Sequence, residues 1–216
     1  MPTTRSPQSE PSTRGRPPMT ERRREIIRME IARAAVRLFT EKGVSGTTGD
    51  DIAHELGIST RTLWRYFPSK ESCVRPLLTT GLDLMAGHLR SCPADTALLV
   101  HLDRERVFDG NALVPEESVT DLIRMTRTEP GLMAVWLEVH HAAEAVFADV
   151  IAARTGGSAD DLAIRVQAAT LNAALRLAAE EQVRHHRGAD TASGGGMGAL
   201  VRTALAAAVP SLPSFG

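Results

Sequence analysis

The sequence predicts an all-α fold in which a small N-terminal unit of three helices is followed by a larger helical body. Aromatic residues make up only 4% of the 216 residues, and runs of the β-branched residues that strands favour are scarce. Apolar residues instead recur at spacings of three and four, which place them on one face of a helix. A hydrophobic content of 43% suits an ordinary globular chain with a sizeable core.

The chain opens with a segment that has too few apolar side chains to form a core. Residues 1–19 hold five prolines and three arginines, with one apolar residue besides Met1. We expect a disordered basic arm. Such an arm either contacts DNA, along the phosphates or in the minor groove, or is simply unstructured.

A long helix is expected from Thr20, a candidate N-cap, to Lys42 and Gly43. Its apolar residues recur at helical spacing: Ile27, Ile31, Ala34, Ala35, Leu38 and Phe39. Its outward side carries Arg22, Arg23, Arg24, Arg28 and Arg33. The first four of these either face a polyanion or form a solvated charged surface.

The stretch from Thr47 to Phe67 predicts two short helices with a tight turn at Gly57. Thr48 and Ser59 are their candidate caps. The apolar residues that would face inward are Ile52, Ala53, Leu56, Leu63 and Phe67. Thr60, Arg61, Thr62, Trp64, Arg65 and Tyr66 are then left mostly outward on the second helix. A helix-turn-helix presents such a helix to the major groove of DNA, and a plain helical hairpin is the alternative.

A fourth helix is expected to follow the Pro68 break, with Ser69 as its cap and Pro76 as a residue that kinks it or delays its start. Its apolar stripe runs through Leu77, Leu78, Leu82, Met85 and Leu89 to Cys92 and Pro93. The body then predicts further helices at about 95–108, 115–128, 130–154, 159–186 and 192–209, and glycines at 194–196 delay the last one to about Met197.

The helix expected at 159–186 is apolar on two sides. One stripe consists of Leu162, Val166, Ala169 and Ala173, and the other of Ile164, Ala168, Leu171, Leu175 and Ala178. The last helix is similarly apolar and rich in small residues. A helix with two apolar sides must be covered twice, either inside one core or by a second copy of the chain, and we expect a homodimer.

Charge is divided unequally along the chain. Residues 1–75 hold 14 Lys and Arg against 9 Asp and Glu, whereas residues 76–216 hold 11 against 17. A basic N-terminal third joined to an acidic body indicates that the two parts meet different partners.

The cysteine content and the length of the apolar runs indicate the cellular compartment. The two cysteines, Cys73 and Cys92, are expected to be buried free thiols, which suits a reducing cytosol. No apolar run is long enough for a membrane span, so we expect a cytoplasmic protein with no membrane partner.

The run from Ile31 to Val74 resembles the DNA-binding domain of the TetR family of transcriptional repressors. The resemblance is carried by RLFTEKG, the TT pair, DDIAHELGIS and, above all, RTLWRYFPSKES. Gly49 departs from the pattern, because a branched apolar residue commonly follows the TT pair. We expect it to weaken the first turn of the second helix by roughly 1 kcal/mol in helix propensity.

The resemblance implies an all-α homodimer with two helix-turn-helix heads, and a body in which a small molecule changes the spacing of the heads. It divides the chain into an arm (1–19), a DNA-binding domain (20–68) and a helical ligand-binding and dimerisation domain (69–216). It implies that Thr60 and Arg61 touch base edges and that Trp64 stacks on sugar or a thymine methyl group. The residues that match phosphate-gripping positions are Thr48, Thr62, Arg65, Tyr66 and Lys70.

A ligand pocket is expected among the central helices. The candidates are Met85, His88 and Leu89 on the fourth helix, and Met125, Met133, Trp136, Leu137 and His140 on the sixth and seventh. Adaptable methionines and the polar tips of tryptophan and histidine suit a hydrophobic or aromatic effector with one or two polar groups. Each residue is alternatively plain core.

No other chemistry is indicated. The doublets His140-His141 and His185-His186 point about 100° apart on a helix and cannot chelate a metal by themselves. No nucleophile elbow, phosphate loop or dinucleotide fingerprint is visible, so we expect neither an enzyme nor a cofactor.

The leading interpretation is a ligand-responsive transcriptional regulator, a repressor that binds a palindromic operator as a homodimer and is released by a small effector of unknown identity. One alternative is a DNA-binding dimer without a pocket that is controlled by a protein partner or acts as an activator. Another is a small-molecule-binding or catalytic body with a vestigial head. A cavity in the body, or its absence, separates the first alternative from the leading interpretation.

Overall fold

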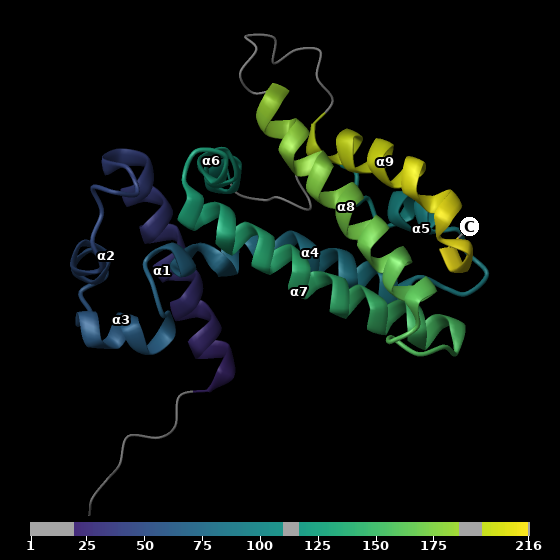
Figure 1. Ribbon diagram of the computed structural model, residues 1–216, viewed down its shortest axis with the longest axis horizontal. Helices are drawn as coiled ribbons and strands as arrows, with labels where there is room; N and C mark the ends of the chain where they lie inside the picture. Colours follow the sequence, from purple (N-terminus) through teal and green to yellow (C-terminus); the bar gives the residue numbers. More distant parts are fainter. Residues whose placement is uncertain (1–19, 110–116, 186–195, 216) are drawn as a thin grey trace, which may run out of the picture.

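The computed structural model describes residues 20–109, 117–185 and 196–215, and no strand occurs among them (Figure 1). The predicted all-α fold is confirmed. The predicted arm at 1–19 lies outside the described residues, as do Pro115 and His186 at predicted helix ends.

The head consists of α1 (Glu21–Lys42), α2 (Gly49–Glu55) and α3 (Thr60–Tyr66). α2 packs against both α1 and α3, and the three lie together at one end of the molecule (Figure 1). The predicted inward residues Ile52, Ala53, Leu63 and Phe67 are buried, while Leu56 is half-buried. These residues belong to the same continuous apolar core as the body, and the outer side of α3 points away from it.

Local hydrogen bonds set the limits of α2 and α3. Thr48 Oγ1 accepts from the Asp51 N–H at 3.1 Å, and the Asp51 carboxylate accepts from the Thr48 N–H at 2.8 Å, which is a capping box. The Thr48 hydroxyl also donates to the Asp51 carboxylate at 2.6 Å, and this bond, together with the one from the Thr48 N–H, lowers the pKa of Asp51. Ser59 Oγ accepts from the Thr62 N–H at 3.2 Å, and Gly57 has φ 62° in the turn between the helices. Thr20 differs from expectation, because its side chain makes no capping bond within the described residues.

A short 3-10 helix, η1 (Glu71–Val74), leads into α4 (Arg75–Ser91). Ser69 Oγ accepts from the Ser72 N–H at 3.2 Å, so Ser69 caps this turn. Pro76 lies in the first turn of α4. A proline is tolerated in the first turn because the N–H groups there have no partner within the helix. The α-helix accordingly starts late, at Arg75 after η1, and not directly after Ser69.

The body contains α5 (Leu98–Arg104), α6 (Glu117–Thr126), α7 (Pro130–Thr155), α8 (Leu162–His185) and α9 (Met197–Ala208), followed by the 3-10 turns η2 (Val209–Ser211) and η3 (Pro213–Phe215). α4 and α7 run side by side through the middle of the molecule, and α8 packs against α6, α7 and α9 (Figure 1). Among the described helices, none has the length and apolar composition needed to cross a membrane.

Two helices, α5 and α8, differ from a predicted end by three residues or more. α5 ends at Arg104 instead of 108, because Arg106 adopts a left-handed φ of 58° and the Val107 N–H turns back to the Leu102 carbonyl. α8 begins at Leu162 instead of 159, because the Ser158 N–H donates to the Asp161 carboxylate in a preceding turn. Backbone reversals of this kind leave little trace in the apolar periodicity.

The two stripes of α8 have different surroundings. All five residues of the stripe from Ile164 to Ala178 are buried against the rest of the body. In the other stripe Leu162 is 73% exposed and Val166 is 55% exposed, and Ala169 and Ala173 are half-buried. One side of α8 is therefore covered by this chain and the other is open to a further partner.

Candidate functional site

The outer side of α3 presents cationic and aromatic groups to solvent. Arg61 and Arg65 are exposed, and the ring of Trp64 is 42% exposed. Leu63 fixes this orientation, because it is fully buried on the opposite side of the same short helix. Exposed polar and planar groups of this kind can reach base edges, and the base contacts expected of Thr60, Arg61 and Trp64 stay predictions.

Trp64 also packs against the start of α2. A Cβ placed on Gly49 would lie 2.6 Å from Cη2 of the indole, so any larger residue would collide with the ring. Gly49 is thus not simply a weak point of α2, as we expected from its propensity. The glycine makes room for Trp64, and the indole occupies the space of the missing side chain.

Thr60 is held by a carboxylate from the neighbouring helix. Its hydroxyl donates to Asp50 Oδ1 at 2.5 Å. Asp50 is exposed at the start of α2, where a carboxylate favours the positive end of the helix dipole. Asp50 was not among the predicted contact residues, because a pairing across ten positions and a turn gives no periodic signal.

Lys70 differs from the other predicted phosphate-gripping residues. Its Nζ donates to the carbonyl oxygens of Val44 at 2.6 Å and Thr47 at 2.8 Å. These bonds tie the segment after α3 to the loop between α1 and α2. The ammonium group is therefore engaged inside the head, and its expected role at a phosphate has to compete with this structural role.

The surroundings of α3 are basic, although several arginines have partners within the head. The guanidinium of Arg28 lies 6.0 Å from the ring centroid of Phe67, which brings the N-terminal part of α1 close to the end of α3. Arg65 lies over the Tyr66 ring at 5.5 Å. Arg24 pairs with Glu21 on its own helix. The cationic surface of α1 is thus partly neutralised, and the predicted DNA contacts of Thr48, Thr62, Arg65 and Tyr66 stay predictions.

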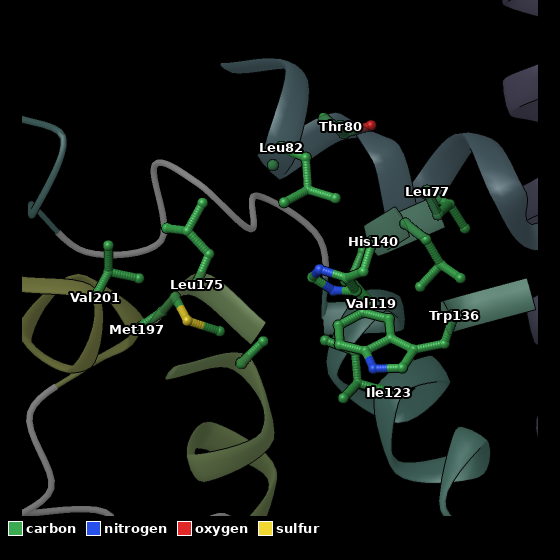
Figure 2. Close-up of a pocket in the computed structure, with 13 residues that line it drawn as sticks. Leu77, Thr80, Leu82, Val119, Ile123, Trp136, His140, Leu175, Met197 and Val201 are labelled. Atoms are coloured by element: carbon green, nitrogen blue, oxygen red, sulfur yellow. The ribbon is translucent and has the colours of Figure 1, made fainter. Parts of the chain in front are cut away.

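The body contains an apolar cavity between α4, α6, α7, α8 and α9 (Figure 2). Its volume is about 70 Å³. It is lined by Leu77, Leu78, Thr80, Gly81, Leu82, Val119, Ile123, Trp136, His140, Leu175, Ala179, Met197 and Val201. Most of these side chains are hydrocarbon, which suits an apolar ligand.

Two of the predicted pocket residues, Trp136 and His140, line this cavity. The structure does not bring the others to it. Met85 and Leu89 are buried elsewhere in the core, and His88 and Met125 line separate surface hollows. Met133 packs against the core and Leu137 is exposed. Helical spacing locates the inner side of each helix, but the position of a void depends on how five helices pack together.

His140 is the most polar group in the cavity wall. Its Nδ1 lies 2.7 Å from Asn172 Oδ1, and its ring makes an edge contact with Trp136 at a centroid distance of 4.2 Å. Burial lowers the pKa of the imidazole, and the hydrogen bond with Asn172 opposes that shift. His141, the other member of the doublet, points to solvent, so the two rings diverge as predicted.

Comparison with known proteins agrees with this architecture. The family model described as bacterial regulatory proteins of the tetR family matches residues 31–77, and the model of the MftR C-terminal domain matches residues 106–213. The HTH-type transcriptional regulator TcmR of Streptomyces glaucescens is 28% identical over 172 residues, which cover 70% of this chain and 71% of TcmR. The HTH-type transcriptional repressor KstR2 of Rhodococcus jostii is 40% identical over 67 residues, which cover 31% of this chain and 33% of KstR2.

A solved structure from Mesorhizobium loti, assigned to the TetR family, has the same fold. It covers 92% of this chain and all of its own, with a TM-score of 0.51 and 21% identity. The relatives are transcriptional regulators and share the helix-turn-helix head. The chain therefore belongs to the TetR family of bacterial regulatory proteins and is a DNA-binding transcriptional regulator, not an enzyme.

Proposed function

We propose that this regulator is a repressor that binds a two-fold-related operator as a homodimer and leaves it when a small, mainly apolar effector enters the cavity. The head would comprise residues 20–68 and the ligand-binding and dimerisation body residues 69–216. The observation that carries the proposal is that two helices of the cavity wall, α4 and α6, also contact α1 of the head.

These contacts give the cavity a direct mechanical connection to the head. α4 contributes Leu77, Leu78 and Leu82 to the wall, and its first turn follows η1, which packs on α1. α6 contributes Val119 and Ile123. A displacement of either helix by a ligand would therefore move α1 and, with it, the reading helix.

The size of the cavity makes such a displacement necessary. Ligand pockets typically measure about 300–1,000 Å³, whereas this one measures about 70 Å³. A drug-sized effector would have to push the wall outward. Release of DNA then requires that the expanded body binds the effector more tightly than the compact body, since equal affinity shifts no equilibrium.

The dimer is supported by the outer stripe of α8. Leu162 and Val166 are largely exposed, and the neighbouring side of α9 offers the half-buried Leu200 and Ala204. A self-complementary surface of two helices per chain would make a four-helix interface. Two-fold symmetry would place the heads about one or more helical turns of DNA apart, ~34–36 Å each.

The cavity favours this proposal over the alternative of a filled body controlled by a protein partner. Because the proposal requires operator binding, the experiment measures DNA binding itself. Selection of bound DNA from a random pool should enrich a two-fold-related sequence. Recovery of no such sequence would refute the proposal.

The selected DNA then permits a test of the reading helix. Arg61→Ala should cost about 1–3 kcal/mol of discrimination at one base pair in each half-site. Arg90→Ala, an exposed arginine on α4 far from the head, serves as the matched control and should leave the preference unchanged. Equal sequence preference in Arg61→Ala and the native protein would show that α3 does not read the operator as assigned.

A further inference from the structure

A chain of hydrogen bonds leads from the half-buried Glu144 to the cavity. Glu144 Oε1 accepts from Asn172 Nδ2 at 3.0 Å, and Asn172 Oδ1 lies 2.7 Å from His140 Nδ1. His140 is 5% exposed and Asn172 is 3% exposed. The far nitrogen of the histidine, Nε2, is buried and has no hydrogen-bond partner among the described residues.

The Glu144 end of this chain fixes the direction of every bond in it. An ionised carboxylate can only accept, so the amide of Asn172 must turn its NH₂ group toward Glu144 and its oxygen toward His140. An amide oxygen also only accepts, so the hydrogen between Asn172 and His140 must be on Nδ1. In the neutral imidazole, Nε2 is then a bare lone pair.

The surroundings keep the ring neutral. Burial lowers the pKa of His140, as does the charge of Arg176, whereas the bond to Asn172 and the charges of Glu180 and Glu144 act in the opposite direction. Desolvation is the largest of these effects. His140 lines the cavity, and its Nε2 is therefore an acceptor in the wall to which no described residue donates a hydrogen (Figure 2).

The only hydroxyl in the wall does not supply that hydrogen. Thr80 Oγ1 donates to the Pro76 carbonyl of its own helix at 2.9 Å. A buried acceptor without a partner is costly, and a ligand that supplies a donor removes this cost. A ligand with only acceptors would add a second unsatisfied group beside Nε2.

We propose that the effector is a neutral, mainly apolar molecule whose single hydroxyl or N–H group donates to His140 Nε2. This inference rests on the proposed function, because it names the chemistry of the ligand for the same cavity. It excludes carboxylate effectors, which would need a protonated imidazole. Glu144 and Asn172 are then positioning residues, since they act on the ligand only through the tautomer of His140.

Three probes of similar shape test the donor. The full chain is titrated calorimetrically with 4-propylphenol, 4-propylanisole and 4-propylbenzoate at neutral pH. The phenol should bind roughly 5- to 150-fold more tightly than the anisole, the range expected when a buried acceptor is satisfied, and the benzoate should bind most weakly. Equal binding of phenol and anisole, tighter binding of benzoate, or no binding by any probe would overturn the inference.

Variants locate the effect at His140. His140→Phe should abolish the preference for the phenol, whereas the control His54→Phe, at an exposed histidine on α2 of the head, should retain it. The double exchange Glu144→Gln with Asn172→Asp keeps the net charge but places the carboxylate directly against Nδ1. The imidazole should then be protonated, Nε2 should become a donor, and the preference should shift to the benzoate.

Nitrogen-15 spectra of the imidazole give a readout that does not depend on folding of any variant. The native protein should show His140 protonated at Nδ1 and bare at Nε2, and a spectrum of the opposite tautomer would overturn the inference. Operator release measured with the same probes separates the two proposals. If the phenol and the anisole bind equally tightly and both release the operator, only the proposed donor to His140 is refuted. If a probe binds tightly and the operator is not released, the proposed effector-released repressor is refuted.

Discussion

Replacement of Gly49 by alanine tests the packing of Trp64 against α2. The added methyl group would collide with the edge of the indole. Crowding of this kind costs about 1–3 kcal/mol, and the low end applies because the ring is 42% exposed and can move outward. Against this cost stands the better helix propensity of alanine, at most ~1 kcal/mol. Gly49→Ala should therefore be neutral or slightly destabilising.

The same change should become stabilising when the indole is absent. In a Trp64→Ala background only the propensity gain of about 0.5–1 kcal/mol remains. The double-mutant cycle should thus show a coupling of about 1–2 kcal/mol between the two positions. Hydrogen exchange of the α2 and α3 amides in the full chain measures it, because exchange reports the opening free energy of each segment.

Another glycine, Gly87, provides the control. Gly87 lies on α4, and a Cβ there meets no atom within 4 Å among the described residues. Gly87→Ala should have the same effect with tryptophan or alanine at position 64. If Gly49→Ala also had the same effect in both backgrounds, to within about 0.3–0.5 kcal/mol, the proposed contact between Gly49 and Trp64 would be refuted.

Three further predictions concern other parts of the molecule. Lys70→Met removes the two bonds from Nζ to backbone carbonyls, so the opening free energy of the head should fall by about 1–3 kcal/mol in hydrogen exchange. If the opening free energy is unchanged and the salt slope of DNA binding falls by about one unit, Lys70 binds a phosphate instead. Leu162→Asp on the outer stripe of α8 should make the protein sediment as a monomer. The control Leu84→Asp, at an exposed leucine of α4, should leave the dimer intact. Dimers in both variants would contradict the proposed interface. Burial raises the pKa of the Cys73 thiol from 9.0 to about 12, so the folded state keeps this proton longer than the unfolded state does. Relative to Cys73→Ala, the unfolding free energy should thus fall by up to ~1.4 kcal/mol per pH unit above pH 9, and parallel pH profiles would refute this.

The sequence predicts those features that depend on neighbouring residues. The caps at Thr48 and Ser59 and the turn at Gly57 each involve groups within three positions, and the structure confirms all three. The two-sided character of α8 was predicted for the same reason, because helical spacing alone sorts its residues into an inner and an outer stripe.

The candidate site was predicted less completely, because its contacts join distant positions. The pairing of Trp64 with Gly49 depends on the crossing of α2 and α3. Of the cavity wall, Trp136 and His140 were predicted, but Val119, Leu175 and Met197 were not. These three are ordinary apolar residues, and only the packing of separate helices shows that a void lies between them. The hydrogen bond between His140 and Asn172 spans 32 positions and has no signature in the sequence.

The hydrogen bond between Thr60 and Asp50 has a consequence for the bases that α3 can accept. Because the threonine gives its hydrogen to the carboxylate, Thr60 itself offers oxygen lone pairs and no hydroxyl hydrogen to a base. Guanine presents two acceptors in the major groove, which would be unfavourable opposite the Thr60 oxygen. The amino groups of cytosine and adenine are donors and could hydrogen-bond to that oxygen. The exposed carboxylate would also disfavour an approaching phosphate. Operator half-sites should therefore carry an amino-bearing base opposite Thr60, and Asp50→Asn should relax that choice.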